Sequence, residues 1–350
     1  MSENVYARLR EYLDKMPNGY PATDSGVEIR ILKKLFSPED AEFVMKLTQH
    51  PESAREIAKR LGINESKTTE KLENLTRRGL IFRLRKGKSV RYNTVQFLSG
   101  IFDFQLPHMD REYAEMIEEY MPSVARSLMP LKTKQARVVP VGSAIDAAPE
   151  VATYNRVREL VKNHDLIAVA HCRCRREQGL LGHNCDRPSE TCFFFGVWAQ
   201  YYIDTGMGRE LSKDEAMKLF AMAEESKLVL CASNTQELMF ICSCCPCCCV
   251  AFKLLKLTEN PGDLVLSYYR AAINPDVCTA CGACLERCQI NAIAEKDGVM
   301  EVLPARCIGC GLCVSACPTD AIKLEEKRRP APPATMGEWH KRLSDERGVS

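Results

Sequence analysis

The sequence lacks several features that would place the protein in a common functional class. No apolar run approaches the length of a membrane span, and the charged, helix-like start with Arg8, Arg10 and Glu11 is unlike a signal peptide. There is no Gly-x-Gly-x-x-Gly after a strand, no P-loop, and no Ser or Cys nucleophile with a recognisable base partner. We therefore expect neither a membrane-spanning nor a secreted protein, and nothing indicates a nicotinamide or flavin cofactor.

The net charge is also small, only +2 over 350 residues, a length with room for two or three domains. Cysteine, in contrast, is abundant, with 19 residues. Such a number would indicate disulfides in a small secreted protein, but here it favours metal ligands in a reducing cytoplasm. Because exposed thiolate-bound clusters are sensitive to oxygen, we expect the protein to come from an anaerobe.

Eight of the cysteines form two runs with the same spacing near the C-terminus. Each run has three cysteines separated by two residues, and a fourth after three more: Cys278, Cys281, Cys284 and Cys288, then Cys307, Cys310, Cys313 and Cys317. Cysteine at every third position of a loop can curl around three corners of an Fe4S4 cube, while the fourth cysteine faces a second cube. Zinc also accepts cysteine pairs of this spacing, but eight cysteines in two identical runs argue against it.

This stretch resembles the dicluster domain of bacterial two-cluster ferredoxins, which we place at residues 266–326. Gly282, Gly309 and Gly311 fit, because backbone without a Cβ can approach a cluster. Gln289 departs from the family pattern, which usually has proline there, so we expect looser geometry rather than lost ligation. The resemblance implies two 4Fe-4S clusters, one held by Cys278, Cys281, Cys284 and Cys317 and the other by Cys307, Cys310, Cys313 and Cys288.

The N-terminal part is predicted to be helical, with one basic hairpin. We expect helices in residues 1–36, then a helix-turn-helix and two short strands at 80–84 and 90–92. Ser53 and Glu56 predict a capping box, and Asn64 predicts the cap of the next helix. This order resembles a winged helix-turn-helix of the MarR and ArsR kind, which we place at residues 37–136 with a helical extension.

The winged segment is strongly basic, with 12 Lys and Arg against 4 Asp and Glu between residues 53 and 95. This charge suits contacts with DNA phosphates, and Lys67 and Thr68 would then face outward on the recognition helix. Winged helices also dock proteins, so the sequence leaves both functions open. Seven basic residues lie in and before the hairpin without an acidic residue between them: Arg77, Arg78, Arg83, Arg85, Lys86, Lys88 and Arg91.

Residues 137–265 alternate between apolar strands and helices, which predicts a small α/β unit. We expect strands at 138–141, 166–170, 228–230 and 239–241, and helices at 150–162, 193–203 and 213–224. Residues 327–350 form a tail with a short helix around Trp339. The fold class is therefore α+β multidomain: a winged helix-turn-helix, a Cys-rich α/β middle domain and a ferredoxin-like dicluster domain.

Ten cysteines of this middle domain are candidate ligands of one or two further Fe–S clusters: Cys172, Cys174, Cys185, Cys192, Cys242, Cys244, Cys245, Cys247, Cys248 and Cys249. One assignment groups the first four, with Cys172 and Cys174 pointing the same way on an extended segment. The rival assignment mixes both halves, because strands that end side by side bring their loops together. We expect Cys231 to be a buried hydrophobe. Arg173, Arg175, Arg176 and Arg187 would offset the cluster charge.

The chain as a whole resembles 4Fe-4S dicluster proteins of anaerobic bacteria, some of which carry an N-terminal winged helix. That resemblance implies cluster binding and electron transfer to a redox partner protein or oxidoreductase complex. Two alternatives stay open: an Fe–S redox sensor that regulates transcription through DNA binding, and an Fe–S subunit of an oxidoreductase. A homodimer is also compatible with the helices of residues 96–136.

Overall fold

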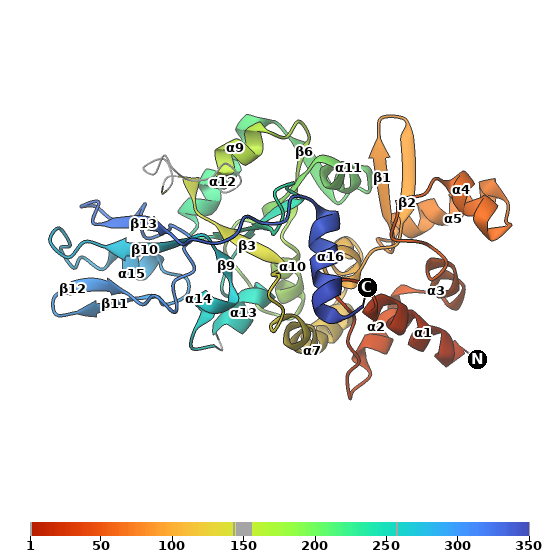
Figure 1. The fold of residues 1–350 in the computed structure, drawn as a ribbon, viewed down its shortest axis with the longest axis horizontal. Coiled ribbons are helices and arrows are strands. Elements are labelled where there is room, and N and C mark those ends of the chain that lie inside the picture. Colours follow the sequence, from red (N-terminus) through yellow and green to blue (C-terminus); the bar gives the residue numbers. More distant parts are fainter. Residues whose placement is uncertain (1, 143, 145–155, 257, 350) are drawn as a thin grey trace.

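The computed structural model describes residues 2–142, 144, 156–256 and 258–349. The molecule is elongated (Figure 1), with a helical N-terminal section at one end, a large sheet in the middle and two small hairpin-like sheets at the other end. No helix in the described ranges is long and apolar enough to cross a membrane.

The N-terminal section begins with five helices and one hairpin, in the order expected from the sequence. Ser53 and Glu56 form the predicted capping box, and the side chain of Asn64 caps the next helix by accepting from the Lys67 N–H. The elements are α1 (Ser2–Asp14), α2 (Val27–Leu35), α3 (Pro38–Val44), α4 (Ala54–Leu61), α5 (Glu65–Arg77), β1 (Phe82–Lys86) and β2 (Ser89–Asn93).

After the hairpin the chain makes an irregular turn, η1 (Phe97–Ile101), followed by α6 (Phe102–Phe104) and the long helix α7 (Arg111–Leu128). Phe102 and Phe104 are buried, and through them this turn packs against the middle of the molecule. The ring of Phe104, for example, lies 4.4 Å from that of Tyr201.

The middle of the molecule is a seven-stranded sheet in the order β6-β4-β5-β8-β7-β3-β9. All neighbouring strands are antiparallel except β3 and β9. The strands are β3 (Ala136–Val139), β4 (Ile167–His171), β5 (Glu190–Phe195), β6 (Gly208–Leu211), β7 (Val229–Ser233), β8 (Phe240–Cys244) and β9 (Leu266–Ser267).

The helix predicted at 193–203 is wrong in its first turn, because Phe193–Phe195 belong to β5. These apolar residues pair with strands on both sides, and Gly196, with a φ of 56°, separates the strand from α11. Burial on both faces of a central strand outweighs the helical preference of the following residues. The other helices around the sheet are α9 (Val157–Lys162), α10 (Arg173–Leu180), α11 (Gly196–Asp204), α12 (Lys213–Glu225), α13 (Val250–Lys256) and α14 (Pro261–Leu264).

Alternate residues of the strands belong to two different hydrophobic cores. Ala168 and Phe194 face a core shared with the N-terminal section, whereas Ile167 and Phe193 face a core that continues into the C-terminal section. The sheet is therefore covered on both faces and joins the two ends of the molecule.

The C-terminal section contains two antiparallel strand pairs and a final helix. Strand β10 (Tyr269–Ile273) pairs with β13 (Ile322–Glu326), and β11 (Ile293–Lys296) pairs with β12 (Val299–Val302). Helix α15 (Ala283–Arg287) lies between β10 and β11 in the sequence. Helix α16 (Met336–Arg347) returns to the N-terminal section (Figure 1). There Trp339 is fully buried, and Arg347 donates to the carbonyl oxygens of Asp14 and Met16.

Candidate metal centres

The two cysteine runs of the C-terminal section fold into loops around α15 and after β12. One cavity is lined by Cys288, Cys307, Cys310 and Cys313, so the structure brings together three cysteines of the second run and the fourth cysteine of the first. In the first run, burial raises the pKa of Cys284, and its neighbours Cys278 and Cys281 raise this pKa further. No contact between Cys317 and these three is recorded among the described residues.

Backbone N–H groups point at the sulfur atoms of both runs. Ala292 N donates to Cys288 Sγ over 3.1 Å, and Ala321 N donates to Cys317 Sγ over 3.3 Å, each from four residues further along the chain. The same bond therefore forms after both fourth cysteines, although Gln289 follows one and Pro318 the other. Such donors stabilise negative charge on sulfur, which fits thiolates bound to an Fe–S cluster.

Glycine is required at positions 309 and 311 for a reason that the sequence did not indicate. Both have positive φ angles, of 65° and 80°. A Cβ on Gly309 would lie 2.0 Å from the carbonyl oxygen of Tyr269, and one on Gly311 would lie 2.7 Å from the Cβ of Ala144. These glycines therefore let the second cysteine loop pack closely on its neighbours.

Two thiols of the second cysteine loop have raised pKa values. Burial, followed by the charges of Cys288 and Cys307, raises the pKa of Cys310 to about 12. Burial also raises the pKa of Cys313, with the charges of Cys310 and Cys307 as the next causes. Positively charged iron would reverse this effect, because a coordinating thiol is deprotonated.

The middle-domain cysteines lie on adjacent strands and on the turns that follow them. Cys192 on β5 is paired in register with Cys242 on β8, and Cys242 is paired with Cys231 on β7. Residues that face each other across neighbouring strands point to the same side of a sheet. This row was not visible in the sequence, because β5 was taken for part of a helix.

Cys172 and Cys174 do not lie on an extended segment as expected. Cys172 precedes α10 as its N-cap, and Cys174 lies in the first turn of that helix. The chain turns at the end of β4, where Cys172 N donates to the carbonyl oxygen of Ser189 instead of continuing the ladder. The two thiols still lie close together, since the Cys174 thiol raises the pKa of Cys172 and the Cys172 thiol lowers the pKa of Cys174.

Six cysteines of the middle domain form a closed ring in which neighbouring thiols shift one another's pKa, called the six-cysteine ring below. Its members, in order around the ring, are Cys172, Cys174, Cys249, Cys244, Cys242 and Cys192. The neighbouring thiols of Cys172 and Cys249 lower the pKa of Cys174. Cys231 raises the pKa of Cys244 and is only half-buried, so it is not the buried hydrophobe that was expected.

The remaining four, Cys185, Cys245, Cys247 and Cys248, form a second group, called the four-cysteine group below. Their sulfur atoms all lie within 4.8 Å of one another. Both groups therefore draw on both halves of the middle-domain sequence. The grouping of Cys185 with Cys172, Cys174 and Cys192 does not occur, and the mixed arrangement does.

Arginine side chains surround these thiols in different ways. Arg175 is buried and feels the charges of Cys172, Cys245, Cys185 and Cys192, so it lies between the two groups. Arg173 instead points to the N-terminal section, where it donates to the Phe102 carbonyl oxygen and lies 3.2 Å above the Phe102 ring centre. Arg176 is exposed.

Several basic residues of the hairpin region are engaged within the molecule. Arg83 and Arg85 both form ion pairs with Asp204 at the end of α11, and Arg83 also pairs with Glu73. Arg78 pairs with Asp40 and Arg91 with Glu56. Four of the seven basic residues expected to contact phosphates therefore have acidic partners.

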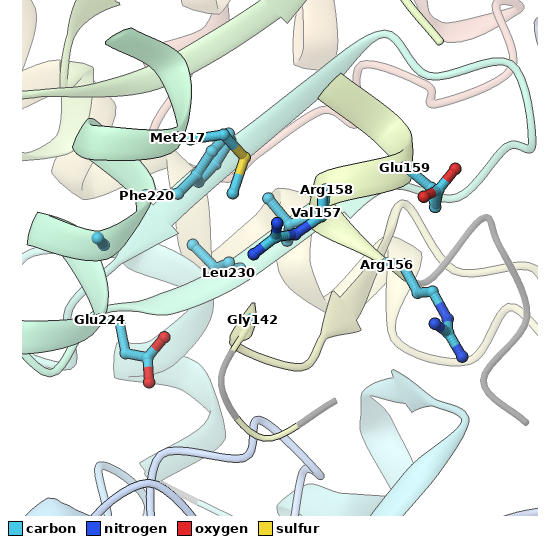
Figure 2. Close-up of a pocket in the computed structure, with 10 residues that line it drawn as sticks. Gly142, Arg156, Val157, Arg158, Glu159, Met217, Phe220, Glu224 and Leu230 are labelled. Atoms are coloured by element: carbon cyan, nitrogen blue, oxygen red, sulfur yellow. The ribbon is translucent and has the colours of Figure 1, made fainter. Parts of the chain in front are cut away.

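Two cavities lie near the sheet. An apolar cavity of about 270 Å³ is lined by Cys231, Met121 of α7 and Phe252 of α13, among others. Figure 2 shows the second, between α9 and α12, where Met217 and Phe220 lie on one side and Arg156 and Glu159 on the other. No cysteine is among the described residues that line this second cavity.

Comparison with known proteins identifies the C-terminal section. Residues 271–324 match the model of the 4Fe-4S dicluster domain, a stretch that includes all eight cysteines of the two runs. No curated protein and no solved structure matches the chain. The match and the cysteine groups together show an iron–sulfur protein that carries more than one 4Fe-4S cluster.

Proposed function

We propose that the protein transfers electrons between a ferredoxin-type pair of 4Fe-4S clusters and one further cluster held by the six-cysteine ring. Reversible one-electron transfer is the chemistry that such clusters supply. The observation that carries this proposal is the shared core. Cys244 and Cys249 of the ring belong to the same hydrophobic cluster as Cys284, Cys307 and Cys313 of the dicluster section.

The proposed ligands of the ferredoxin-type clusters are Cys278, Cys281, Cys284 and Cys317 for one and Cys307, Cys310, Cys313 and Cys288 for the other. The cavity lined by the second set supports its assignment. For the first set, the support is the electrostatic coupling among Cys278, Cys281 and Cys284, together with the identical N–H donation to Cys288 and Cys317.

The N-terminal section, in this proposal, is a docking module for a redox partner or oxidoreductase complex. Its hairpin is engaged with the middle domain through the ion pairs of Arg83 and Arg85 with Asp204. The Tyr201 hydroxyl also donates to the carbonyl oxygens of Thr76 and Ile81, at the end of α5 and before β1. A hairpin held in this way has fewer arginines available for phosphate contacts.

One observation favours a redox-sensing regulator as the second candidate. Arg173 lies between Cys172 and Cys174 in sequence and holds Phe102 of the N-terminal section. A change in the charge of the ring could therefore be felt by the segment that follows the hairpin. The regulator requires a specific DNA site whose affinity depends on redox state.

The deciding experiment measures iron, acid-labile sulfide and EPR spectra of the full chain, purified without oxygen and then reduced. We expect about 12 iron and 12 sulfide per chain, from three cubes of four irons each. A Cys242→Ser variant should lose about four of each, while the EPR signals of the ferredoxin pair remain. Because a cube uses four of the six thiols, each ring cysteine is replaced by Ser in turn. Full iron and sulfide in all six single variants would show that the ring holds no cluster.

DNA binding is tested on the same preparation by selection from genomic fragments, first reduced and then oxidised. The docking proposal predicts no preferred sequence in either state. A specific site bound in only one redox state would replace it by the regulator.

A further inference from the structure

We propose that the four-cysteine group binds a single metal ion with tetrahedral thiolate coordination, and not a 4Fe-4S cube. The ion is thiophilic, zinc or iron, and its ligands are Cys185, Cys245, Cys247 and Cys248. This site is separate from the six-cysteine ring and from the ferredoxin pair, and it goes beyond the electron-transfer function proposed above.

The spacing of the sulfur atoms carries this inference. Cys185 Sγ lies 3.7 Å from Cys247 Sγ, and Cys248 Sγ lies 3.7 Å from Cys247 Sγ, with all four sulfur atoms within 4.8 Å of one another. Four thiolates around one zinc ion, at a bond length of about 2.3 Å, are separated by roughly 3.8 Å along each edge of the tetrahedron. Two of the six edges thus have the length expected of a single-ion site, and the other four do not exceed 4.8 Å.

A cube would need the sulfur atoms to be farther apart. Each cysteine of a 4Fe-4S cluster binds a different iron, so the separation between the irons adds to the separation between the thiolates. A disulfide would need them much closer, at about 2.05 Å. All four cysteines are free thiols, so no disulfide joins them. Their spacing within 4.8 Å is too short for a cube.

The local backbone explains how one short run serves two sites. Strand β8 ends at Cys244, a member of the ring, and Pro246 then helps to end the extended chain. Cys249 N donates to the carbonyl oxygen of Cys245, which closes a tight turn. The turn carries Cys245, Cys247 and Cys248 away from the ring and returns Cys249 to it.

The fourth ligand comes from the loop between α10 and β5. Cys185 Sγ lies 3.7 Å from Cys247 Sγ, although the two residues are 62 positions apart in the sequence. Two residues after this ligand, the Arg187 guanidinium donates to the carbonyl oxygens of Ser226 and Lys227 and to Gln289 Oε1, which fixes the loop that carries Cys185.

Arg175 supports the same site through charge and position. Four thiolates and one divalent ion have a net charge of −2, which a neighbouring guanidinium offsets. The Arg175 guanidinium, which is only 7% exposed, donates to the carbonyl oxygens of Pro188 and Ser243. Those two residues belong to the two segments that carry the ligands, so Arg175 holds the segments together.

The exposure of the ligands fits an ion that can enter from solvent. Cys245 and Cys248 are buried, whereas Cys247 is exposed and Cys185 is intermediate. Metal can therefore reach the site past Cys247, and a chelator can reach the metal.

The test uses the full chain purified without oxygen. Iron, zinc and sulfide are counted, and zinc-edge X-ray absorption and ⁵⁷Fe Mössbauer spectra are recorded. We expect about one metal ion per chain in excess of sulfide, either zinc with four sulfur neighbours at about 2.3 Å or a single high-spin iron in a sulfur site. The two spectra distinguish zinc from iron, and either result supports the site. Absence of any excess ion overturns it.

Two variants locate the ion. Cys247→Ser, at the exposed ligand, and the double variant Cys185→Ser with Cys247→Ser should lose that one ion and keep all sulfide. The reciprocal control is Cys192→Ser in the ring, which should lose iron and sulfide in equal numbers and keep the excess ion. Loss of about four irons and four sulfides from the Cys185 and Cys247 double variant would mean that the group holds a cube, and the proposal would be wrong. If the ring holds no cluster, the Cys192 variant alone gives an unexpected result, because it keeps its iron and sulfide. The results for the Cys185 and Cys247 variants are then unchanged.

Discussion

The Arg187 guanidinium donates a hydrogen bond to Oε1 of Gln289 over 3.2 Å, and so joins the loop that carries Cys185 to the residue after Cys288. Gln289 is the position at which the first cysteine run departs from the ferredoxin pattern. The side-chain amide of Gln289 also donates to the Arg287 carbonyl oxygen. The departure therefore has a structural use, since proline could not accept from Arg187.

This contact can be tested by Gln289→Ala. We expect the variant to lose about 0.5–1.5 kcal/mol of unfolding free energy, because a side-chain hydrogen bond between the middle and C-terminal sections is removed. Iron and sulfide content should stay the same, since the Ala292 N–H still donates to Cys288. Denaturant unfolding gives the free energy, and Lys323→Ala, at an exposed position of β13, is the control. A loss of iron would show that Gln289 has a direct part in ligation.

Two glycines of the dicluster section form a matched pair of variants. Gly309→Ala places a Cβ against the Tyr269 carbonyl oxygen, whereas a Cβ on Gly298 meets nothing within 4 Å, although both residues have positive φ angles. The Gly298→Ala variant should therefore show only backbone strain of about 1–2 kcal/mol and keep its clusters. Gly309→Ala should displace the second cysteine loop and lose about four irons per chain. Equal iron content in both variants would contradict this.

The ion pairs of Asp204 are tested by Asp204→Asn. The side chain of Asp204 is 7% exposed and serves Arg83 and Arg85 together, so the variant should lose roughly 2 kcal/mol of stability. Asp214→Asn, at an exposed position of α12, should have little effect. DNA affinity is measured for both. The docking proposal predicts that released arginines bind DNA weakly, without sequence preference and with strong salt dependence. Sequence-specific binding by the variant would argue for the regulator.

The buried position of His340 on α16 predicts that the free energy of unfolding depends on pH, independently of the cysteines. Burial lowers the pKa of His340 to about 4, from its ordinary value of 6.5. Between these two pH values the unfolded chain binds more protons than the folded one, so stability falls as the pH drops. The loss should reach about 1 kcal/mol at pH 5.5 relative to pH 7.

Urea unfolding at the two pH values measures this loss, with the fluorescence of Trp198 and Trp339 as the readout. His340→Gln should remove that part of the pH dependence, while His108→Gln, at an exposed histidine, should leave it unchanged. The same slope in the His340 variant and in the unaltered protein would assign it to other groups.

The sequence predicted the α+β class and the 4Fe-4S clusters, because the cysteine spacing of the C-terminal section reports the geometry of its loops directly. It also predicted the helix caps at Ser53 and Asn64, which depend only on neighbouring residues. It failed where long-range pairing decides the structure. Residues 193–195 of β5, which follow Cys192, were taken for the start of a helix, since their burial between β4 and β8 is not a local property.

The same limit explains the middle-domain cysteines. Which thiols meet depends on strand register, so the sequence could offer two groupings but not choose between them. The partner of Cys185 lies 62 residues away at Cys247. The expected geometry of Cys172 and Cys174 was wrong because a helix begins between them, although the two thiols still meet.

The arrangement of the run from Cys242 to Cys249 limits how the length of this segment can change in evolution. Its cysteines are divided between two neighbouring groups, with Cys242, Cys244 and Cys249 in one and Cys245, Cys247 and Cys248 in the other. A one-residue insertion or deletion inside the run would move every later cysteine to the wrong side, so both groups would be lost by one event. Lineages that keep either group should therefore keep the length of this segment unchanged, while the loop that supplies Cys185 is free to vary in length.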